Sequence, residues 1–208
     1  MSTLLDQPSY PRTQVAVLDA TERLLAQRPF SQLSVNDIID EAGISRTSFY
    51  AHFDSRTAVI SECLRRLMGA IAVAVDPFLA ESETDPEAAI RASIRRWVAV
   101  ASEHGTVLRT VSEQWPHDER LRTLWFSIMA RFVAGTARVI RIARAGGQAP
   151  AGADEEQLSA CLMWGYERVL QVATAGDATG LPDADAIVEP LAQMMTGGVY
   201  GLPAPAAR

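Results

Sequence analysis

The feature that most constrains this chain is a pair of helix-start signals separated by one glycine. Ser34 stands before an apolar helical pattern and has an acidic residue three positions later, which predicts an N-cap with a weaker form of the capping box. Gly43 follows where that pattern ends, as expected of a left-handed residue just past a helix C-terminus. Ser45 is the next N-cap candidate. The sequence therefore predicts two short helices, residues 34–42 and 45–53, joined by a tight turn.

Two short helices joined by a glycine turn have the geometry of a helix-turn-helix, in which the second helix enters the major groove of DNA. Phe49 and Phe53 lie four residues apart and are expected to share the inner face of that helix. The outer surface carries no acidic residue and offers groups that hydrogen-bond to phosphates or base edges: Arg46, Thr47, Ser48, Tyr50 and His52. Two alternatives stay open: an ordinary helical hairpin with solvated polar residues and, for the histidine, a packed neutral imidazole.

The charge of the chain limits how it can hold DNA. Every basic residue is an arginine, and the formal net charge is −6. Residues 1–68 contain 7 Arg and 8 acids, a net of −1, whereas residues 69–208 contain 12 Arg and 17 acids, a net of −5. The surplus of basic charge expected of a nucleic-acid-binding domain is therefore missing. We expect few phosphate contacts per subunit, and hence a need for two subunits.

Helical spacing of apolar residues runs through nearly the whole chain, and strand-like alternation with hairpin turns is absent. We therefore predict an all-α fold of about nine helices. A helix capped by Asp54 or Ser55 is expected to run toward Ala74, and the other predicted ranges are 12–27, 86–104, 105–114, 118–145, 154–175 and 184–198. Residues 1–60 are interpreted as an N-terminal arm and a three-helix domain that contains the helix-turn-helix, and residues 61–208 as a second helical domain, for which the family resemblance described below implies effector binding and dimerisation.

Several kinds of site and location are not expected. The start of the chain lacks the basic and apolar regions of a signal peptide, and no run of 18 apolar residues occurs, so we expect a cytoplasmic protein without a membrane span. Cys63 and Cys161 stand in no ligand spacing for a metal, and both thiols are predicted to be buried. No cofactor fingerprint is present, so no cofactor is expected.

The segment FSQLSVNDIIDEAGISRTSFYAHFDSRTAVI, residues 30–60, resembles the DNA-binding segment of the TetR family of bacterial regulators. The shared features are the spacing from Ser34 to Gly43, the run YAHF, and Ser55 opening the next helix. The family commonly has lysine after that serine, where this chain has Arg56 and keeps the charge.

The resemblance implies that the second short helix faces the groove of a double-stranded operator, and that phosphates are bound at helix starts. A helix-turn-helix dimer reads two half-sites about 34–36 Å apart or a multiple of that, so a palindromic operator is expected. The predicted DNA-binding residues are Ser34, Ser45, Arg46, Thr47, Ser48, Tyr50, His52 and Arg56.

All four tryptophans lie beyond residue 90, and Trp125, Met129 and Phe132 follow i, i+4, i+7 spacing along one helix face. One interpretation is a stripe of core residues. The other is a tunnel between helices that holds a ligand, because helical bundles build ligand sites from facing side chains.

The resemblance extends to this region. TetR-type regulators bind an effector in a variable helical domain. The segment LWFSIMARFVAGTARVIRIARAGGQAP, followed by GYERVL, is similar to the branch that contains the repressor of an ethionamide-activating monooxygenase. In that branch an apolar channel is lined by Trp, Phe and Asn, and Met163 and Tyr166 stand here where the branch has Asn. This departure removes amide groups and puts the same ligand chemistry in doubt. The predicted residues for a small hydrophobic effector are Trp97, Trp125, Met129, Phe132, Met163 and Tyr166.

Family members dimerise through their last two long helices, which correspond here to residues 154–175 and 184–198. These ranges carry apolar stripes for a homodimer: Leu158, Leu162, Val169 and Val172 in the first, and Ile187, Leu191 and Met194 in the second. Small residues such as Gly165 would let helices approach closely.

The function predicted from these features is a DNA-binding transcriptional regulator, a repressor that a small apolar ligand releases from its operator. The alternative is a ligand-binding helical module without DNA binding. A third possibility, an enzyme, rests on His104 and His117 near Ser102, Ser112, Glu103 and Glu113. No nucleophile elbow, P-loop, dinucleotide fingerprint or HExxH motif occurs, so catalysis is not expected.

Overall fold

The computed structural model describes residues 10–75, 85–175 and 186–201, and within these ranges the chain is helical without a strand. The nine described α-helices are α1 (Arg12–Gln27), α2 (Val35–Ala42), α3 (Arg46–Tyr50), α4 (Arg56–Val75), α6 (Pro86–Glu103), α7 (Gly105–Gln114), α8 (Glu119–Ala145), α9 (Glu155–Ala175) and α10 (Val188–Tyr200). A 3₁₀ helix, η1 (Phe30–Gln32), lies between α1 and α2 and was not predicted. The all-α prediction is confirmed.

Capping fixes where the first short helices begin and end. The Ser34 hydroxyl accepts a hydrogen bond from the Asp37 amide at 3.2 Å, and the Asp37 carboxylate accepts from the Ser34 amide at 2.7 Å, so the predicted capping box is complete. The Ser34 hydroxyl and the Ser34 amide both donate to the Asp37 carboxylate, and with Arg28 they hold the pKa of this carboxyl well below its usual range. Gly43 ends α2 at φ 65°, the left-handed conformation for which glycine is suited.

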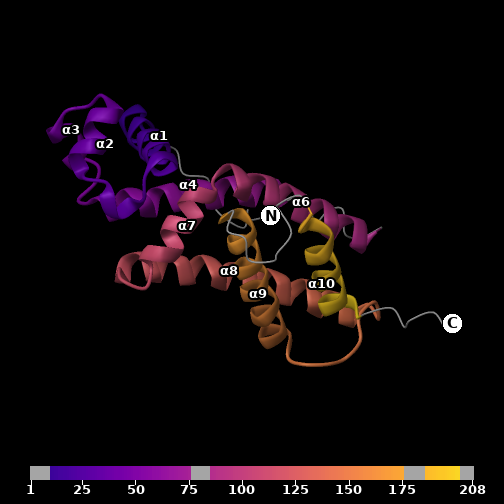
Figure 1. Cartoon of the computed structure of the whole chain (residues 1–208). Helices are drawn as coiled ribbons and strands as arrows, with labels where there is room; N and C mark the ends of the chain where they lie inside the picture. The colour runs from indigo at the N-terminus through magenta and orange to yellow at the C-terminus, as the bar shows by residue number, and fades with distance from the viewer. Residues whose placement is uncertain (1–9, 76–84, 176–185, 202–208) are drawn as a thin grey trace.

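Helices α1, α2 and α3 gather at one end of the molecule, which we call the head (Figure 1). Their inner faces meet in a dry core in which Leu18, Ile38 and Phe49 are completely buried. The remaining helices, α6 to α10, form the body, where α9 crosses and contacts α8 and α10 contacts α6.

Helix α4 joins the two parts, because it contacts α1 in the head and α6, α7 and α8 in the body. The predicted domain boundary between residues 60 and 61 falls inside this helix. A rigid element that runs from one part into the other can transmit a displacement between them. The division into residues 1–60 and 61–208 stays a prediction.

Most predicted helices are found within a few residues of their expected bounds, and α1 and α7 match at both ends. The second short helix is shorter than predicted, because α3 ends at Tyr50. Beyond it the His52 amide bonds to the Phe49 carbonyl at 3.0 Å, a tighter turn typical of helix ends. Residues 184 and 185 of the last predicted helix lie outside the described ranges, and α10 runs from Val188 to Tyr200.

The two cysteines differ from each other. Cys63 is buried on α4, as predicted, and burial raises the pKa of its thiol. Cys161 is exposed on α9, so the prediction that both thiols are buried is wrong for this residue. The i, i+3, i+4 pattern of α9 turns its apolar stripe inward at Leu162 and leaves position 161 on the outer face.

Among the described helices, α8 alone is long and apolar enough to cross a membrane by length and composition. A single helix of this kind is weak support for a membrane span, since core helices pass the same test. Helix α8 packs against α9 within the body, and its exposed face carries Arg131, Arg138 and Arg141.

Candidate DNA-binding surface and effector region

The two faces of α3 differ sharply in exposure. Phe49 and Phe53 on the inner side are 0 % and 3 % exposed and contact each other at 5.7 Å between ring centroids. Tyr50, the residue that follows Phe49, is 48 % exposed. The other predicted contact residues that are exposed on this side of the head are Arg46, Thr47 and His52. The assignment of the phenylalanines to packing is thus confirmed.

The three serines of this region are engaged in helix caps. Ser45 opens α3: its hydroxyl accepts from the Ser48 amide at 3.1 Å and lies 2.9 Å from the Ser48 hydroxyl. Ser34 caps α2 in the same manner. Ser34 and Ser45 are exposed, whereas Ser48 is half-buried. The Ser34 hydroxyl also donates to the Asp37 carboxylate at 2.6 Å, so a phosphate contact through its proton would require it to leave this partner.

Arg46 is held in place by its neighbours on two helices. Its guanidinium donates to the Asn36 side-chain oxygen at 2.8 Å and lies 5.5 Å from the centroid of the Tyr50 ring. Asn36 is an exposed residue of α2 that the sequence analysis did not single out. Its place beside α3 depends on how the two helices cross, which no local pattern reveals. The contacts orient a cation at the outer edge of the head.

His52 is exposed, which excludes the packed imidazole that the sequence left open. Its Nδ1 lies 3.5 Å from the Gln14 side-chain nitrogen of α1, at the limit of a hydrogen bond. Its ring meets the Phe53 ring edge-on at 6.5 Å. The imidazole therefore stands at the surface beside α1.

Arg56 lies in a different environment from the one expected. Its guanidinium donates to the Phe30 carbonyl at 3.0 Å and also to the Leu33 carbonyl, and it lies 4.6 Å from the centroid of the Phe30 ring. Each contact ties the start of α4 to η1. The half-buried guanidinium thus serves packing inside the head, and a phosphate contact would require it to leave these partners.

An open hollow of about 440 Å³ lies where the end of α3 meets α4 and the start of α8. Arg120 of α8 bridges to Asp54 of the head at 2.9 Å across it. Both side chains are strongly exposed, so the bridge contributes little to stability. Its walls mix acids and bases: Tyr50, Ala51, His52, Phe53, Asp54, Ala58, Ser61, Glu62, Arg65 and Arg120.

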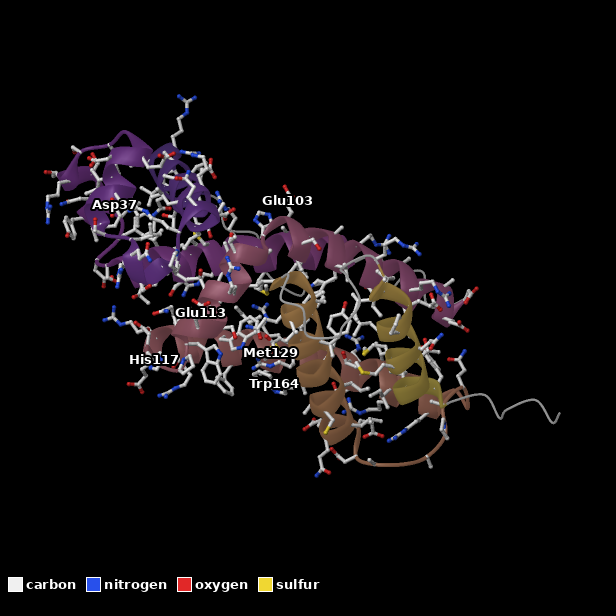
Figure 2. The ribbon with its side chains drawn as sticks, viewed as in Figure 1. Asp37, Glu103, Glu113, His117, Met129 and Trp164 are labelled. Atoms are coloured by element: carbon white, nitrogen blue, oxygen red, sulfur yellow. The ribbon has the colours of Figure 1, made fainter. Side chains whose placement is uncertain are left out.

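The six predicted effector residues all join the main hydrophobic core of the molecule. Trp125, Met129, Met163 and Tyr166 are buried, each at 8 % exposure or less. Trp97 and Phe132 are half-buried and pack against them. Figure 2 shows Met129 and Trp164 in the body, far from Asp37 in the head.

Two of these residues touch across helices. The Trp97 ring of α6 contacts the Tyr166 ring of α9 at 4.5 Å between centroids and an angle of 41°. On the neighbouring helix α8, the Thr136 hydroxyl donates to the Met163 sulfur at 3.3 Å. Burial raises the pKa of Tyr166 well above its usual value, so its hydroxyl stays protonated.

Helices α9 and α10 use part of their predicted dimer stripes inside the protomer. Leu162, Ile187 and Leu191 are buried, so their expected role at a dimer interface gives way to packing within one chain. Helix α10 approaches α9 closely at Gly198, where a Cβ would lie 2.6 Å from Leu162 Cδ2.

The outer face of α9 remains open. A Cβ at Gly165 would meet nothing within 4 Å, and Cys161 and Arg168, at neighbouring positions on that face, are exposed. The partly buried stripe residues Leu158, Val169 and Val172 accompany them on this helix. All of these α9 residues are at least partly accessible in the single chain.

A charged cluster links α1 to α4 and to the junction of α6 and α7. Arg66 donates to Asp19 and Glu22, each at 2.6 Å, and Glu22 also lies 3.1 Å from His104 Nδ1. The hydrogen bond to Glu22 raises the pKa of His104. Burial opposes the ionisation of Glu22, but hydrogen bonds from His104 and Arg66 keep its pKa below the usual value.

The two histidines that suggested catalysis stand in different surroundings. His104 is engaged with Glu22, and Figure 2 shows Glu103 well apart from Glu113 and His117. Within the described ranges, no group of three or more His, Cys, Asp or Glu side chains converges as a metal site would require.

Both parts of the chain match models of known protein families. Residues 17–63 match the family model described as bacterial regulatory proteins, tetR family, and residues 90–201 match the model described as transcriptional regulator EthR, C-terminal domain. The chain is 31 % identical over 197 residues to the HTH-type transcriptional regulator EthR of Mycobacterium tuberculosis strain CDC 1551, covering 94 % of this chain and 90 % of that protein. It is 28 % identical over 195 residues to EthR of Mycolicibacterium smegmatis, covering 94 % and 89 %.

A solved structure with the same fold is the fatty acid degradation regulator FadR from Bacillus halodurans. It superposes with a TM-score of 0.76 at 16 % identity and covers 92 % of this chain and 98 % of its own. At this identity the likeness establishes the fold alone. The match of the EthR C-terminal model to more than half of the chain, and the relative above 30 % identity, establish the family. The chain belongs to the TetR family of DNA-binding transcriptional regulators, in which it carries the EthR type of C-terminal domain.

Proposed function

We propose that this protein is a repressor that binds a palindromic operator as a homodimer and leaves it when a small apolar effector binds in the body. The observation that carries the DNA-binding part is the contrast on α3 between buried Phe49 and exposed Arg46, Thr47 and Tyr50. A short helix with a dry inner face and an outer face of hydrogen-bonding groups is suited to the major groove. Repression is the usual mode of the family.

The α3 residues would serve different roles at the operator. Arg46, oriented by Asn36, is suited to a bidentate contact with guanine. Tyr50 and His52 stand at the outer edge, where phosphates pass. The N-terminus of α2, which begins after the exposed Ser34, is suited to a second phosphate.

The effector would bind among the aromatic and thioether side chains that the body brings together around Trp97 and Tyr166. An effector controls DNA binding only if it favours one spacing of the two heads over another. Helix α4 runs from the head into the body, and the Glu22–His104 contact ties α1 to the end of α6. These links would pass a displacement in the body to the head.

The homodimer would form through the outer face of α9 together with α10. The open space at Gly165 and the exposed neighbours Cys161 and Arg168 support this face. We further propose the division into residues 1–60 for DNA binding and 61–208 for effector binding and dimerisation, and a role without catalysis, in the cytoplasm where bacterial DNA lies.

The deciding experiment is a gel shift on the DNA upstream of the protein's own gene with wild type, Tyr50→Ala and Phe126→Ala. Tyr50 and Phe126 are exposed to a similar extent, 48 % and 46 %, but Phe126 lies on α8 in the body. We expect Tyr50→Ala to lose DNA affinity by about tenfold or more, since such base and phosphate contacts are each worth about 1–3 kcal/mol. Phe126→Ala should bind as wild type does.

Sequence-specific binding that is equal in all three proteins would contradict the role of α3. Absence of any specific binding at low salt would instead favour the alternative, a ligand-binding helical module without DNA binding. Circular dichroism and sedimentation of each variant separate a loss of contacts from a loss of fold.

A further inference from the structure

The corner between α7 and α8 brings an arginine of the body beside the head. Arg120 lies in the first turn of α8, and its Nη1 donates to the Oδ2 of Asp54 at 2.9 Å. Asp54 stands between α3 and α4, two positions after His52. Helices α4 and α8 contact each other, and Figure 1 shows that α8 begins at the side of the molecule where the head lies. The body thus presents a cation at the edge of the predicted DNA-binding surface.

The open hollow at this junction connects Arg120 with two predicted DNA contacts. Tyr50 and His52 share with Arg120 the wall of this hollow, whose volume is about 440 Å³. Both acids of the wall, Asp54 and Glu62, form ion pairs with arginines. A DNA strand that passes Tyr50 and His52 would therefore reach Arg120 without meeting an unpaired carboxylate in this wall.

Most of the Arg120 guanidinium is free to bind. An arginine side chain carries five N–H donors in a planar fork, and within the described residues this one donates to Asp54 alone. Its side chain is 85 % exposed. Phosphate oxygens suit such a fork, because they accept short, charge-assisted hydrogen bonds from two of its N–H groups at once. Asp54 orients this fork as Asn36 orients that of Arg46 on α3.

We propose that Arg120 is a DNA-binding residue supplied by the body, which Asp54 holds in place while its free N–H groups donate to an operator phosphate beside those at Tyr50 and His52. The proposal rests on operator binding through α3, as in the proposed function, and extends the DNA-binding surface beyond the helix-turn-helix. Asp54 balances the charge of Arg120, so the contact adds hydrogen bonds without adding an unpaired cation.

The same helix would then contact DNA at its start and the effector along its length. Helix α8 carries Trp125, Met129 and Phe132 of the predicted effector region, and Arg120 precedes them by a few turns. An effector that displaces the start of α8 from α3 would remove a DNA contact directly. This route is shorter than one that passes through α4 into the head.

The test measures the operator affinity of the full-length protein by fluorescence anisotropy. We expect Arg120→Gln to lose about tenfold, the effect of one hydrogen bond to a charged group. Arg122→Gln is the matched control, because Arg122 is an exposed arginine of the same helix that pairs with Glu119. It should bind as wild type does. Circular dichroism checks that both variants keep their fold, as expected from the exposure of these ion pairs.

Asp54→Asn separates a DNA contact from a link that only positions the head on the body. This substitution breaks the ion pair, keeps Arg120 and removes a carboxylate beside the phosphate, so operator affinity should equal or exceed that of wild type. Arg120→Gln should still lower the affinity when it is combined with Asp54→Asn. Ethylation of one phosphate per half-site should interfere with binding by wild type and by Arg122→Gln, but not with binding by Arg120→Gln.

Wild-type affinity of Arg120→Gln overturns the proposal. Equal losses of affinity in Arg120→Gln and Asp54→Asn also overturn it, since they would assign the ion pair a positioning role without a DNA contact. Specific binding that depends on Tyr50 but not on Arg120 excludes this contact and leaves the proposed function standing. If wild type binds no specific DNA, the proposed function and the Arg120 contact both fail.

Discussion

Arg56 illustrates how a single residue can match a family pattern and still serve a local purpose. The resemblance implied a phosphate contact, whereas its guanidinium bonds to the Phe30 and Leu33 carbonyls and packs on the Phe30 ring. Carbonyls of a 3₁₀ turn are good acceptors for a planar cation, and no local pattern around Arg56 indicates that η1 lies beside it. The environment of the Arg56 side chain thus depends on Phe30, which lies 26 positions away in the sequence.

We expect Arg56→Ala to lower the free energy of unfolding by about 2 kcal/mol, because charge-assisted hydrogen bonds are worth about 1.5–3 kcal/mol. Arg56→Lys should recover only part of this loss, since an ammonium cannot hold two carbonyls and stack on a ring together. Urea denaturation measures both. A stability change below about 0.5 kcal/mol with a clear loss of DNA affinity would favour the phosphate contact.

His104 makes the stability of the head–body link depend on pH. The hydrogen bond to Glu22 raises the pKa of folded His104 above 6.5. The contribution of His104 to the free energy of unfolding is therefore fully present below pH 6.5, and it is lost as the pH rises through the pKa of the folded protein. The pKa of Glu22 in the folded protein lies below 4.5. The contribution of Glu22 to the free energy of unfolding is therefore present above pH 4.5, and it is lost as the pH falls through that lowered pKa. Glu103 also favours the imidazolium, and Arg66 opposes it.

The difference in unfolding free energy between wild type and His104→Gln should therefore be largest between pH 4.5 and 6.5 and should shrink toward pH 9. Thermal melts across this range provide the measurement. His117→Gln, at an exposed position, serves as control and should follow wild type throughout. If the difference in unfolding free energy between wild type and His104→Gln grew with pH, the bond between His104 and Glu22 would not be the cause.

At the scale of elements, helix starts and ends could be predicted because their causes are local. Ser34, Gly43 and Ser45 each act within four residues, and the caps and the left-handed turn are found where expected. The contacts made where two helices cross could not be predicted, because they depend on how the helices are placed relative to each other. The bond from Arg46 to Asn36, the contact of Trp97 with Tyr166 and the open face of α9 depend on side chains far apart in sequence.

Two glycines with equally open surroundings, Gly43 and Gly165, are expected to change stability in opposite directions when each is replaced by alanine. A Cβ at Gly43 or at Gly165 meets nothing within 4 Å, but Gly43 has φ +65° whereas Gly165 is helical. Gly43→Ala should cost about 1–2 kcal/mol of strain in the head. Gly165→Ala should stabilise α9 by about 0.5–1 kcal/mol within a protomer, yet weaken the dimer if this face meets a second chain.

Urea denaturation and sedimentation at several dilutions separate these effects. We expect Gly43→Ala to remain dimeric and to have a lower free energy of unfolding. The Gly165→Ala dimer should dissociate at a higher protein concentration than the wild-type dimer does. An unchanged dimer in Gly165→Ala would exclude the outer face of α9 from the interface. Full stability of Gly43→Ala would mean that the turn relaxes to another conformation.

At the scale of the whole molecule, the negative net charge determines how DNA affinity should respond to salt. Among the described residues from α1 to α4, ion pairs with acids engage Arg23, Arg28, Arg65 and Arg66, and carbonyls hold Arg56. Arg12 and Arg46 are exposed and form no ion pair there. A dimer thus presents about four cations to the phosphates.

Each phosphate neutralised by a cation contributes about −0.9 to the slope of log K against log salt concentration. We therefore expect a slope of about −4 for the dimer, measured by fluorescence anisotropy on an operator fragment. Arg46→Gln removes two cations per dimer and should make the slope shallower by about 2. Arg23→Gln, whose cation is already paired with Glu41, should leave it nearly unchanged. A slope of about −8 or steeper would mean that the paired arginines exchange their carboxylates for phosphates, and that the charge balance of the free protein does not describe the bound state.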